Sequence, residues 1–364
     1  MRLQRLVTRG YRNLTDLDCE PPEAGAAILG SNAQGKTNLL EAIYYPVLFR
    51  SFRGSPDQQV MGEGPGFHVE AHIEGAGARS VAVTYLGRKK RITVDGDEAA
   101  RLADVVGTWL AVAFLPADLG LASGPAVERR RYLDRLLSLA DRGYLRSLTR
   151  YRAALAQRNS ALRQDRIEVA QAFAGVLAAS GADLVRRRLD WVRGAANQFA
   201  GEFECLGEEG SATLEYRGGT DLVEAGAWEE ALATALRDDR ARGMTTVGPH
   251  RDDLVLEIGD RRLRDYDSTG QQRSAAIALK LIEITALREA CGTEPALLLD
   301  DVFAELDRER QSRLALRLLG SDERQIFVTS PRPDELPPNM DLPVWTVEGG
   351  KVVASRESRI TSSH

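Results

Sequence analysis

Eight residues near the N-terminus have the types and spacing of a phosphate-binding loop. Gly30-Ser31-Asn32-Ala33-Gln34-Gly35-Lys36-Thr37 matches the pattern G-x-x-x-x-G-K-[ST]. The glycines allow a tight turn that aims consecutive backbone N–H groups at phosphate oxygens, and a helix starting directly after the loop adds its positive N-terminal end. Lys36 is then expected to bridge the β- and γ-phosphates, and the Thr37 hydroxyl to hold Mg²⁺. The octapeptide therefore predicts a nucleotide site.

A phosphate-binding loop also needs an acidic partner for the metal, and a segment near the C-terminus offers one. Leu297, Leu298 and Leu299 form an apolar run that ends in Asp300 and Asp301. We expect this run to be a buried strand beside the strand that leads into the loop, with Asp300 in the metal shell. Asp301 is the candidate general base that polarises an attacking water. Taken alone, an apolar run followed by acids also fits a strand that simply ends in solvent.

A third segment, Ser268-Thr269-Gly270-Gln271-Gln272-Arg273, precedes a long helical pattern. A serine at a helix start can present its hydroxyl and the first N–H groups of the helix to an anion. The same serine is, on its own, an ordinary helix N-cap.

The elements around these segments change in kind along the chain. Strand and hairpin patterns with one helix, near Thr37 to Leu48, fill the first part, a helical pattern follows, and strand patterns then return. The simplest architecture is a split α/β domain, residues 1–125 plus 245–364, with an inserted helical arm, residues 126–244. Lys36 and Asp300 lie far apart in the sequence, and the residues of the arm are inserted in the chain between these two halves of one site.

The composition is that of an ordinary globular protein: 364 residues, 43% hydrophobic, with a formal net charge of −5. This charge argues against a nucleic-acid partner, but residues 128–194 contain fifteen arginines and only seven acids. Some of these arginines should pair with acids at helical spacing, and the rest are candidates to bind a phosphate backbone, as is the hairpin Arg88-Lys89-Lys90-Arg91. GC-rich coding would explain the arginine excess without any function.

Other compositional signals concern the compartment. The three cysteines, Cys19, Cys205 and Cys291, have no C-x-x-C spacing, which excludes a disulfide framework and a standard zinc site and suits a reducing cytosol. We expect neither a signal peptide nor a membrane span, and hence a cytoplasmic protein.

In this order, the loop, the Ser-x-Gly-Gln turn and the carboxylate strand resemble ATP-binding-cassette ATPases, and within that superfamily the chain resembles the RecF family of bacterial DNA replication and repair proteins. The residues that carry the resemblance are Tyr11 to Leu14, Gly30 to Ala42, Ser51 to Arg53, Phe114 to Leu119, Arg130 to Asp134, Val247 to Asp253, Ser268 to Arg273 and Asp300 to Asp307. The implied fold is a mixed α/β ATPase head like that of chromosome-maintenance ATPases, with a short helical arm.

The resemblance implies ATP and Mg²⁺ as cofactors and an ATP-dependent homodimer. Nucleotide contacts would come from Gly30 to Asn38 and from Arg12, while Ser268, Gly270 and Gln271 would close over the γ-phosphate held by the other protomer. Lys36, Asp301 and Ser268 are thus the expected catalytic residues of a weak, DNA-stimulated ATPase that acts as a switch.

The implied role is DNA repair without a membrane partner. The family is expected to bind gapped DNA or junctions of single-stranded and duplex DNA and, with RecO and RecR, to help load RecA.

Three positions, Ala33, Thr269 and Asp301, depart from the superfamily pattern, and the switch histidine of transporters is also absent. Thr269 replaces the first glycine of the transporter-type signature. Ala33 stands where a second glycine is frequent, which strains the loop if that position needs a positive φ. Asp301 replaces a glutamate and reaches one methylene less far, so hydrolysis should be slow. Thr329 and Ser330 follow the last strand where transporter ATPases have a histidine.

Two other classes of protein remain as alternatives. A coiled-coil chromosome organiser needs long heptad arms, whereas the insert here is short and contains glycines such as Gly181 and Gly194. A transporter ATPase should have the switch histidine and a membrane partner, and a small-molecule kinase has no need of the Ser268 segment.

Overall fold

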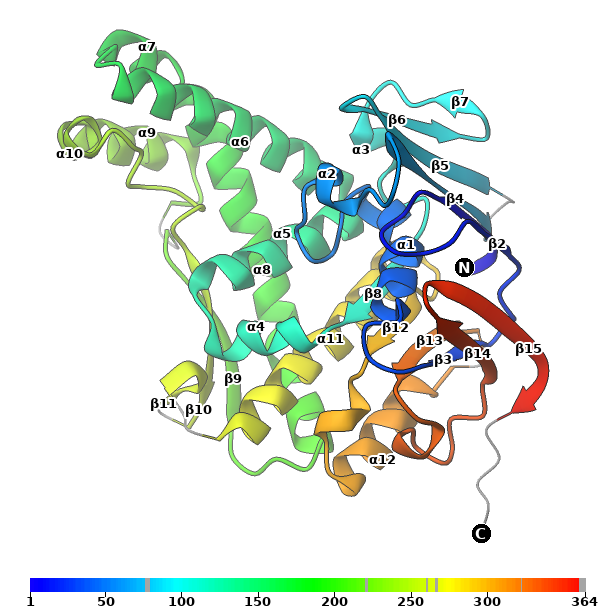
Figure 1. Cartoon of the computed structure of the whole chain (residues 1–364). Helices are drawn as coiled ribbons and strands as arrows, with labels where there is room; N and C mark the ends of the chain where they lie inside the picture. The colour runs from blue at the N-terminus through cyan, green and yellow to red at the C-terminus, as the bar shows by residue number, and fades with distance from the viewer. Residues whose placement is uncertain (76–78, 220–221, 260, 266–267, 322, 360–364) are drawn as a thin grey trace. The chain divides into compact units, whose positions relative to one another are not determined.

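The computed structural model describes residues 1–75, 79–219, 222–259, 261–265, 268–321 and 323–359 (Figure 1). The chain forms two compact units, which we call the head unit (Met1–Asp118 with Glu283–His364) and the arm unit (Leu119–Ile282). The arm unit extends beyond the expected insert of residues 126–244, because strands expected to belong to the head pair with a strand of the insert.

The head unit contains two six-stranded sheets. The first is antiparallel, in the order β2 (Leu17–Cys19), β1 (Arg2–Arg9), β4 (Gly66–Glu74), β5 (Arg79–Leu86), β6 (Lys89–Val94) and β7 (Asp97–Glu98). On β4, buried and partly exposed residues alternate, as expected for a sheet with one face on the core.

The second sheet runs in the order β15 (Lys351–Arg359), β14 (Pro343–Glu348), β3 (Gly25–Leu29), β13 (Ile326–Ser330), β12 (Ala296–Asp300) and β8 (Ala111–Phe114). All neighbours are parallel except the β14–β15 hairpin. Every residue of β8, β12 and β13 is buried, which fits their largely apolar sequences. The carboxylate strand β12 was expected directly beside β3; this was wrong, because β13 lies between them.

Helix α1 (Lys36–Leu48) contacts strands of both head sheets. Eleven of its 13 residues are buried, consistent with a helix that is apolar on nearly all sides. The indole of Trp109 donates to the Ile43 carbonyl at 3.0 Å and so ties the chain before β8 to this helix. The other head helices are α2 (Asp57–Val60), α3 (Leu102–Val105) and α12 (Arg308–Leu318).

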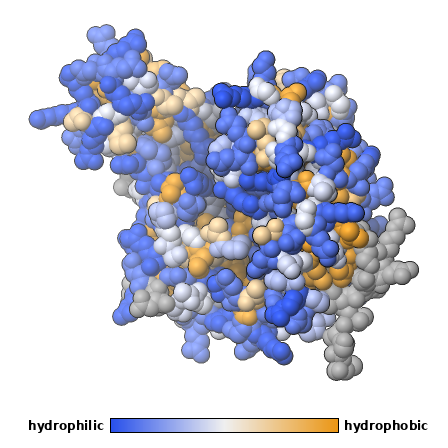
Figure 2. Space-filling view, viewed as in Figure 1, coloured by the Kyte–Doolittle hydropathy of each residue, from blue (hydrophilic) through white to orange (hydrophobic). Residues whose placement is uncertain are grey.

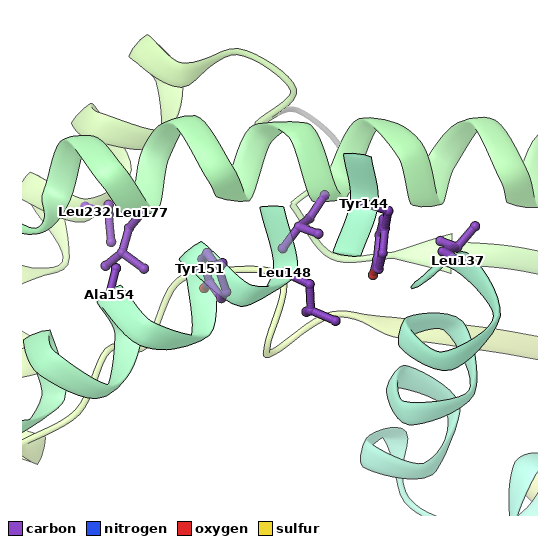
Figure 3. Close-up of a cluster of buried hydrophobic side chains, with 8 residues drawn as sticks. Leu137, Tyr144, Leu148, Tyr151, Ala154, Leu177 and Leu232 are labelled. Atoms are coloured by element: carbon purple, nitrogen blue, oxygen red, sulfur yellow. The ribbon is translucent and has the colours of Figure 1, made fainter. Parts of the chain in front are cut away.

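The arm unit is mainly helical. Its helices are α4 (Leu119–Ser123), α5 (Ala126–Ala140), α6 (Arg142–Arg163), α7 (Ile167–Ala172), α8 (Ala174–Cys205), α9 (Ala225–Thr234), α10 (Leu236–Arg242) and the first part of α11 (Thr269–Cys291). A cluster of buried side chains from α5, α6, α8 and α9 joins them, including Tyr144, Leu148 and Leu177 (Figure 3). Helix α8 continues unbroken through Gly181 and Gly194.

A small sheet completes the arm unit. Strand β10 (Asp253–Ile258) pairs antiparallel with both β9 (Ala212–Arg217) and β11 (Arg261–Arg262). The hairpin that periodicity assigned to the head therefore belongs to the arm unit.

One helical stretch in the described part of the chain, Ile167–Cys205, is long and apolar enough to cross a membrane by length and composition alone. A buried core helix passes the same test. This stretch contains Arg186, Arg187 and Arg188, and Arg188 is buried in ion pairs and hydrogen bonds within the arm.

Candidate nucleotide site

The loop between β3 and α1 has the shape of an anion cradle. A Cβ atom on Gly30 would lie 2.4 Å from the Val347 carbonyl oxygen of β14, so only glycine fits there. Gly35 is the N-cap of α1; no side chain caps this end, and the first turn of α1 contains no acid. The N–H groups that open α1 are therefore available to a phosphate.

Lys36 lies within this cradle. Its Nζ donates to the carbonyls of Gly30 at 2.6 Å and Ser31 at 3.3 Å, and the residue is 5% exposed. The ammonium thus sits against the loop that would surround the phosphates.

Thr37 and Asp300 meet although they are far apart in sequence. The Thr37 hydroxyl donates to Asp300 Oδ1 at 2.8 Å. Burial raises the pKa of Asp300 above its ordinary value, while hydrogen bonds from Thr37 and Thr329 oppose the rise. A hydroxyl beside a carboxylate suits Mg²⁺, which takes few protein ligands and completes its shell with water and phosphate oxygens.

Asp301 is next in the chain and adopts a left-handed backbone, with φ of 50°. Its backbone N–H donates to Thr329 Oγ1 at 2.9 Å, and the same hydroxyl lies 3.0 Å from Asp300 Oδ1 and 3.2 Å from Asp301 Oδ1. The structure thus brings Thr37, Asp300 and Asp301 together as expected and adds Thr329, to which no role was given. The register pairs Thr329 with Asp300, and only the β13–β12 pairing reveals this.

The variable residues of the loop are held from the other side by the β14–β15 turn. Ala33 has φ of 64°, so the position where a second glycine is frequent does take a left-handed conformation. Gly350 N–H donates to the Gln34 carbonyl at 2.9 Å, and Gly349 N–H donates to Gln34 Oε1 at 2.6 Å. The loop is therefore supported on both flanks.

Arg53 is a second cation beside the loop that sequence reasoning did not select. Its guanidinium donates to Asn38 Oδ1 at 2.9 Å, and Asn38 in turn donates to Asn13 at 2.6 Å. The positive charge of Arg53 also lowers the pKa of Asp300, against the larger effect of burial. The segment Ser51 to Arg53 carried the family resemblance, which was the available signal.

Arg12 was expected to touch the adenine or the phosphates. Here it forms a two-point ion pair with the fully buried Glu41, at 2.8 and 3.0 Å, and donates to Ser55 and to the Gln59 carbonyl. Its guanidinium therefore anchors the segment after α1, and a contact with nucleotide stays a prediction.

The Ser268 segment lies in the arm unit, at the start of α11. Gln271 N–H approaches Ser268 Oγ at 3.4 Å, a long cap contact, and Ser268 is exposed. Gly270 is the second residue of the helix. Ser268 and Thr269 are thus exposed, whereas Gly270 and Gln271 are partly buried and Gln272 is buried.

A mainly parallel sheet whose first loop has the shape of an anion cradle and whose carboxylate strand could supply a metal ligand, together with an inserted arm, defines a P-loop ATPase head of the ATP-binding-cassette type. Two chromosome-maintenance (Smc) head structures share this fold, with TM-scores of 0.57 at 15% and 16% identity. A scan of protein-family models finds no match.

Comparison with known proteins narrows the class of ATPase to one family. The chain is 37% identical to the DNA replication and repair protein RecF of Anaeromyxobacter sp. (strain Fw109-5), covering 97% of this chain and 99% of that protein. It is 36% identical to RecF of Moorella thermoacetica, covering 99% and 96%. A solved structure of the recombination mediator protein RecF-ATPrS in the RecFOR pathway matches with a TM-score of 0.88, at 29% identity over 97% of this chain and 98% of that one. The chain belongs to the RecF family of DNA replication and repair proteins.

Proposed function

We propose that this protein is an ATP-dependent DNA-binding repair and recombination factor in which ATP acts as a dimerising switch. One observation carries the proposal: the 2.8 Å hydrogen bond that joins Thr37 to Asp300 beside the uncapped start of α1. A nucleoside triphosphate with Mg²⁺ needs such an anion-binding helix end and a hydroxyl–carboxylate pair in one place.

The residues of the head unit divide the work. Backbone N–H groups of Gly30 to Thr37 and the Lys36 ammonium bind the phosphates, and Thr37 with Asp300 would hold Mg²⁺. The ion, when bound, neutralises negative charge on the phosphates. Asp301 orients the attacking water and accepts its proton. Because an aspartate reaches less far than the usual glutamate, we expect weak hydrolysis.

In the proposed dimer, each subunit contributes Ser268 to the nucleotide site of the other. The exposed hydroxyl of Ser268 and the N–H groups of Gly270 and Gln271 can meet the γ-phosphate held by another copy. We therefore propose a homodimer that forms around two ATP molecules.

DNA is the proposed partner because of the family, whose relatives are named for replication and repair. The solved relatives are assigned to the RecFOR pathway. We propose that this protein binds gapped or junction DNA in the cytoplasm and, with RecR and RecO, promotes RecA loading. The transporter alternative loses support because Thr329 and Ser330, the end of β13, stand where its histidine would be.

The test measures DNA binding with and without ATP on gapped, duplex and single-stranded DNA. Wild type should bind DNA more tightly with ATP, and DNA should raise its ATPase rate. Lys36→Ala should lose ATP binding, whereas Ser268→Arg should bind ATP but fail to dimerise. If DNA leaves the ATPase rate unchanged and ATP leaves DNA affinity unchanged, the switch is refuted.

A further inference from the structure

Helix α6 is unusually one-sided in charge: its 22 residues include six arginines and no acid. Two of the six form ion pairs within the arm unit. Arg158 is 1% exposed and pairs with Asp239 at 2.7 Å, and Arg152 pairs with Asp134 at 2.7 Å.

Three others form what we call the basic stripe: Arg142, Arg146 and Arg150. The sixth, Arg163, is the last residue of α6. The spacing of four between the stripe residues places them on one face of α6, each about 6 Å along the axis from the next. All three are exposed, and within the described residues none has an ion-pair partner. Ala153 and Gln157 continue the same face without charge.

Two acids that contact α6, Asp141 and Asp183, already have other partners. Asp141 caps α6 by accepting from Gly143 N–H at 2.6 Å, and it pairs with Arg187. On α8, Asp183 accepts from Ser147 at 2.7 Å and pairs with Arg186 and Arg187; these partners hold its pKa below the ordinary value. The positive charge of the stripe is therefore not cancelled locally.

The structure also removes most other arginines of residues 128–194 from consideration. Arg129 forms a two-point pair with Asp253, and the buried Arg188 bonds Asp134, Tyr144 and the Pro249 carbonyl. In the hairpin at residues 88–91, Lys90 turns inward to Asp57 and the Phe49 carbonyl. These cations hold the fold together. Around α7 and α10, the viewed surface of the arm unit is predominantly hydrophilic (Figure 2).

We propose that the basic stripe of α6 binds the phosphate backbone of DNA; this rests on the proposed function. A straight row of unpaired guanidinium groups suits a polymer that carries regularly spaced phosphates, each able to accept two N–H groups from an arginine. Such contacts position DNA without reading its sequence. An acidic protein segment is the competing occupant.

The experiment compares DNA affinity over a salt series, with ATP present. The variant Arg142→Gln/Arg146→Gln/Arg150→Gln is set against the matched control Arg131→Gln/Arg186→Gln/Arg240→Gln. The control removes the same charge from exposed arginines that are paired with Glu128, Asp183 and Asp165. ATP binding and melting temperature verify that both variants are folded.

Three lost phosphate contacts should make the slope of log K against log salt shallower by about 2.7, which is roughly fortyfold in affinity between 50 and 200 mM. The control should keep the wild-type slope. Equal slopes for wild type and the stripe variant, or equal losses in both variants, overturn the proposal. So does a stripe variant that loses binding to poly-glutamate but not to DNA. If wild type itself binds no DNA, the proposed function fails together with the stripe proposal. If wild type binds DNA and the stripe variant binds it equally well, only the stripe proposal fails.

Discussion

The Thr329 hydroxyl lies beside both carboxylates of the site. The hydroxyl accepts from Asp301 N–H and lies within hydrogen-bond distance of both Asp300 Oδ1 and Asp301 Oδ1. Since a hydroxyl has one hydrogen to donate, it can bond only one carboxylate at a time. Thr329 is therefore placed to position both acids relative to each other.

Replacing Thr329 by valine should keep the volume and remove the hydroxyl. We expect ATP affinity to change little, kcat to fall at least tenfold, and a higher Mg²⁺ concentration to be needed for half-maximal rate, because Asp300 and Asp301 lose their common partner. Thr329→Ser should restore the rate. A valine variant with wild-type kcat and Mg²⁺ dependence would show that the hydroxyl has no positioning role.

His250 is a partly buried, neutral histidine in the arm unit. Its Nε2 faces the Thr245 carbonyl at 3.0 Å, which can only accept, so Nε2 carries the hydrogen and Nδ1 accepts from the Tyr151 hydroxyl at 2.7 Å. Burial lowers the pKa of His250 below 6.5, and Arg251 and Arg130 lower it further.

The arm unit should therefore lose stability in mild acid. The unfolded chain binds a proton at this histidine near pH 6.5 and the folded chain only at lower pH, so the free energy of unfolding falls as pH drops below 6.5, by up to about 1.4 kcal/mol per pH unit. Urea denaturation at pH 7.5 and 5.5 measures this. His250→Asn should flatten the dependence, and the partly exposed His72→Asn should not; an unchanged acid loss in His250→Asn contradicts the assignment.

At the scale of elements, the β14–β15 hairpin supports the phosphate-binding loop. Besides holding Gln34 through two N–H groups, the turn accepts from Thr15 N–H at 3.0 Å. A Cβ on Gly350 would lie 1.8 Å from the Asn13 carbonyl oxygen, whereas a Cβ on Gly349 meets nothing within 4 Å; both residues have positive φ. An alanine at Gly349 is therefore a matched control for an alanine at Gly350.

Gly350→Ala should destabilise the head unit by roughly 3 kcal/mol, from backbone strain and the clash, and should weaken ATP binding because Gln34 loses its support. Gly349→Ala should cost only about 1 kcal/mol, the strain alone. Thermal melts with and without ATP compare the two. Equal melting temperatures for the two variants would mean that the turn does not depend on close contact with Asn13.

At the scale of the whole molecule, the two sites that the proposed dimer would bring together belong to different parts of the chain. The phosphate-binding loop lies in the head unit and Ser268 in the arm unit. A second copy that supplies Ser268 would couple nucleotide binding to assembly, so the dimer should last as long as ATP does.

Asp301→Asn should therefore trap the dimer. The amide cannot accept the proton of the attacking water, so we expect ATP binding to persist, hydrolysis to fall by at least a hundredfold, and the ATP-bound dimer to accumulate in analytical ultracentrifugation. The double variant Asp301→Asn/Ser268→Arg should remain monomeric. A monomeric single variant with bound ATP would contradict the switch.

Much of the site was predictable because its chemistry is local. Gly30 to Thr37 are consecutive, and the turn, the helix start and the lysine follow from their types alone. Asp300 and Asp301 were recognisable because an apolar run must end where the acids begin. The positive φ at Ala33 was foreseen as a condition from the superfamily pattern and is observed.

The predictions that failed concerned contacts between segments that are far apart in the sequence. Periodicity marks β10 and β12 as strands but does not say which strand each joins, so β10 was assigned to the wrong unit and β13 was missed between β3 and β12. Likewise the net charge of residues 128–194 does not say which arginines meet acids; burial of Arg158 and Arg188 and pairing of Arg129 decided that.

The sequence by itself determined the nucleotide chemistry and the family, because both depend on residue types in a fixed order along the chain. Only the tertiary structure decided that Thr329 joins the two carboxylates, that a glycine turn holds Gln34, and that Arg142, Arg146 and Arg150 are exposed without ion-pair partners among the described residues. Those facts depend on strand order, register and the packing of helices, which bring together side chains that sequence spacing keeps apart.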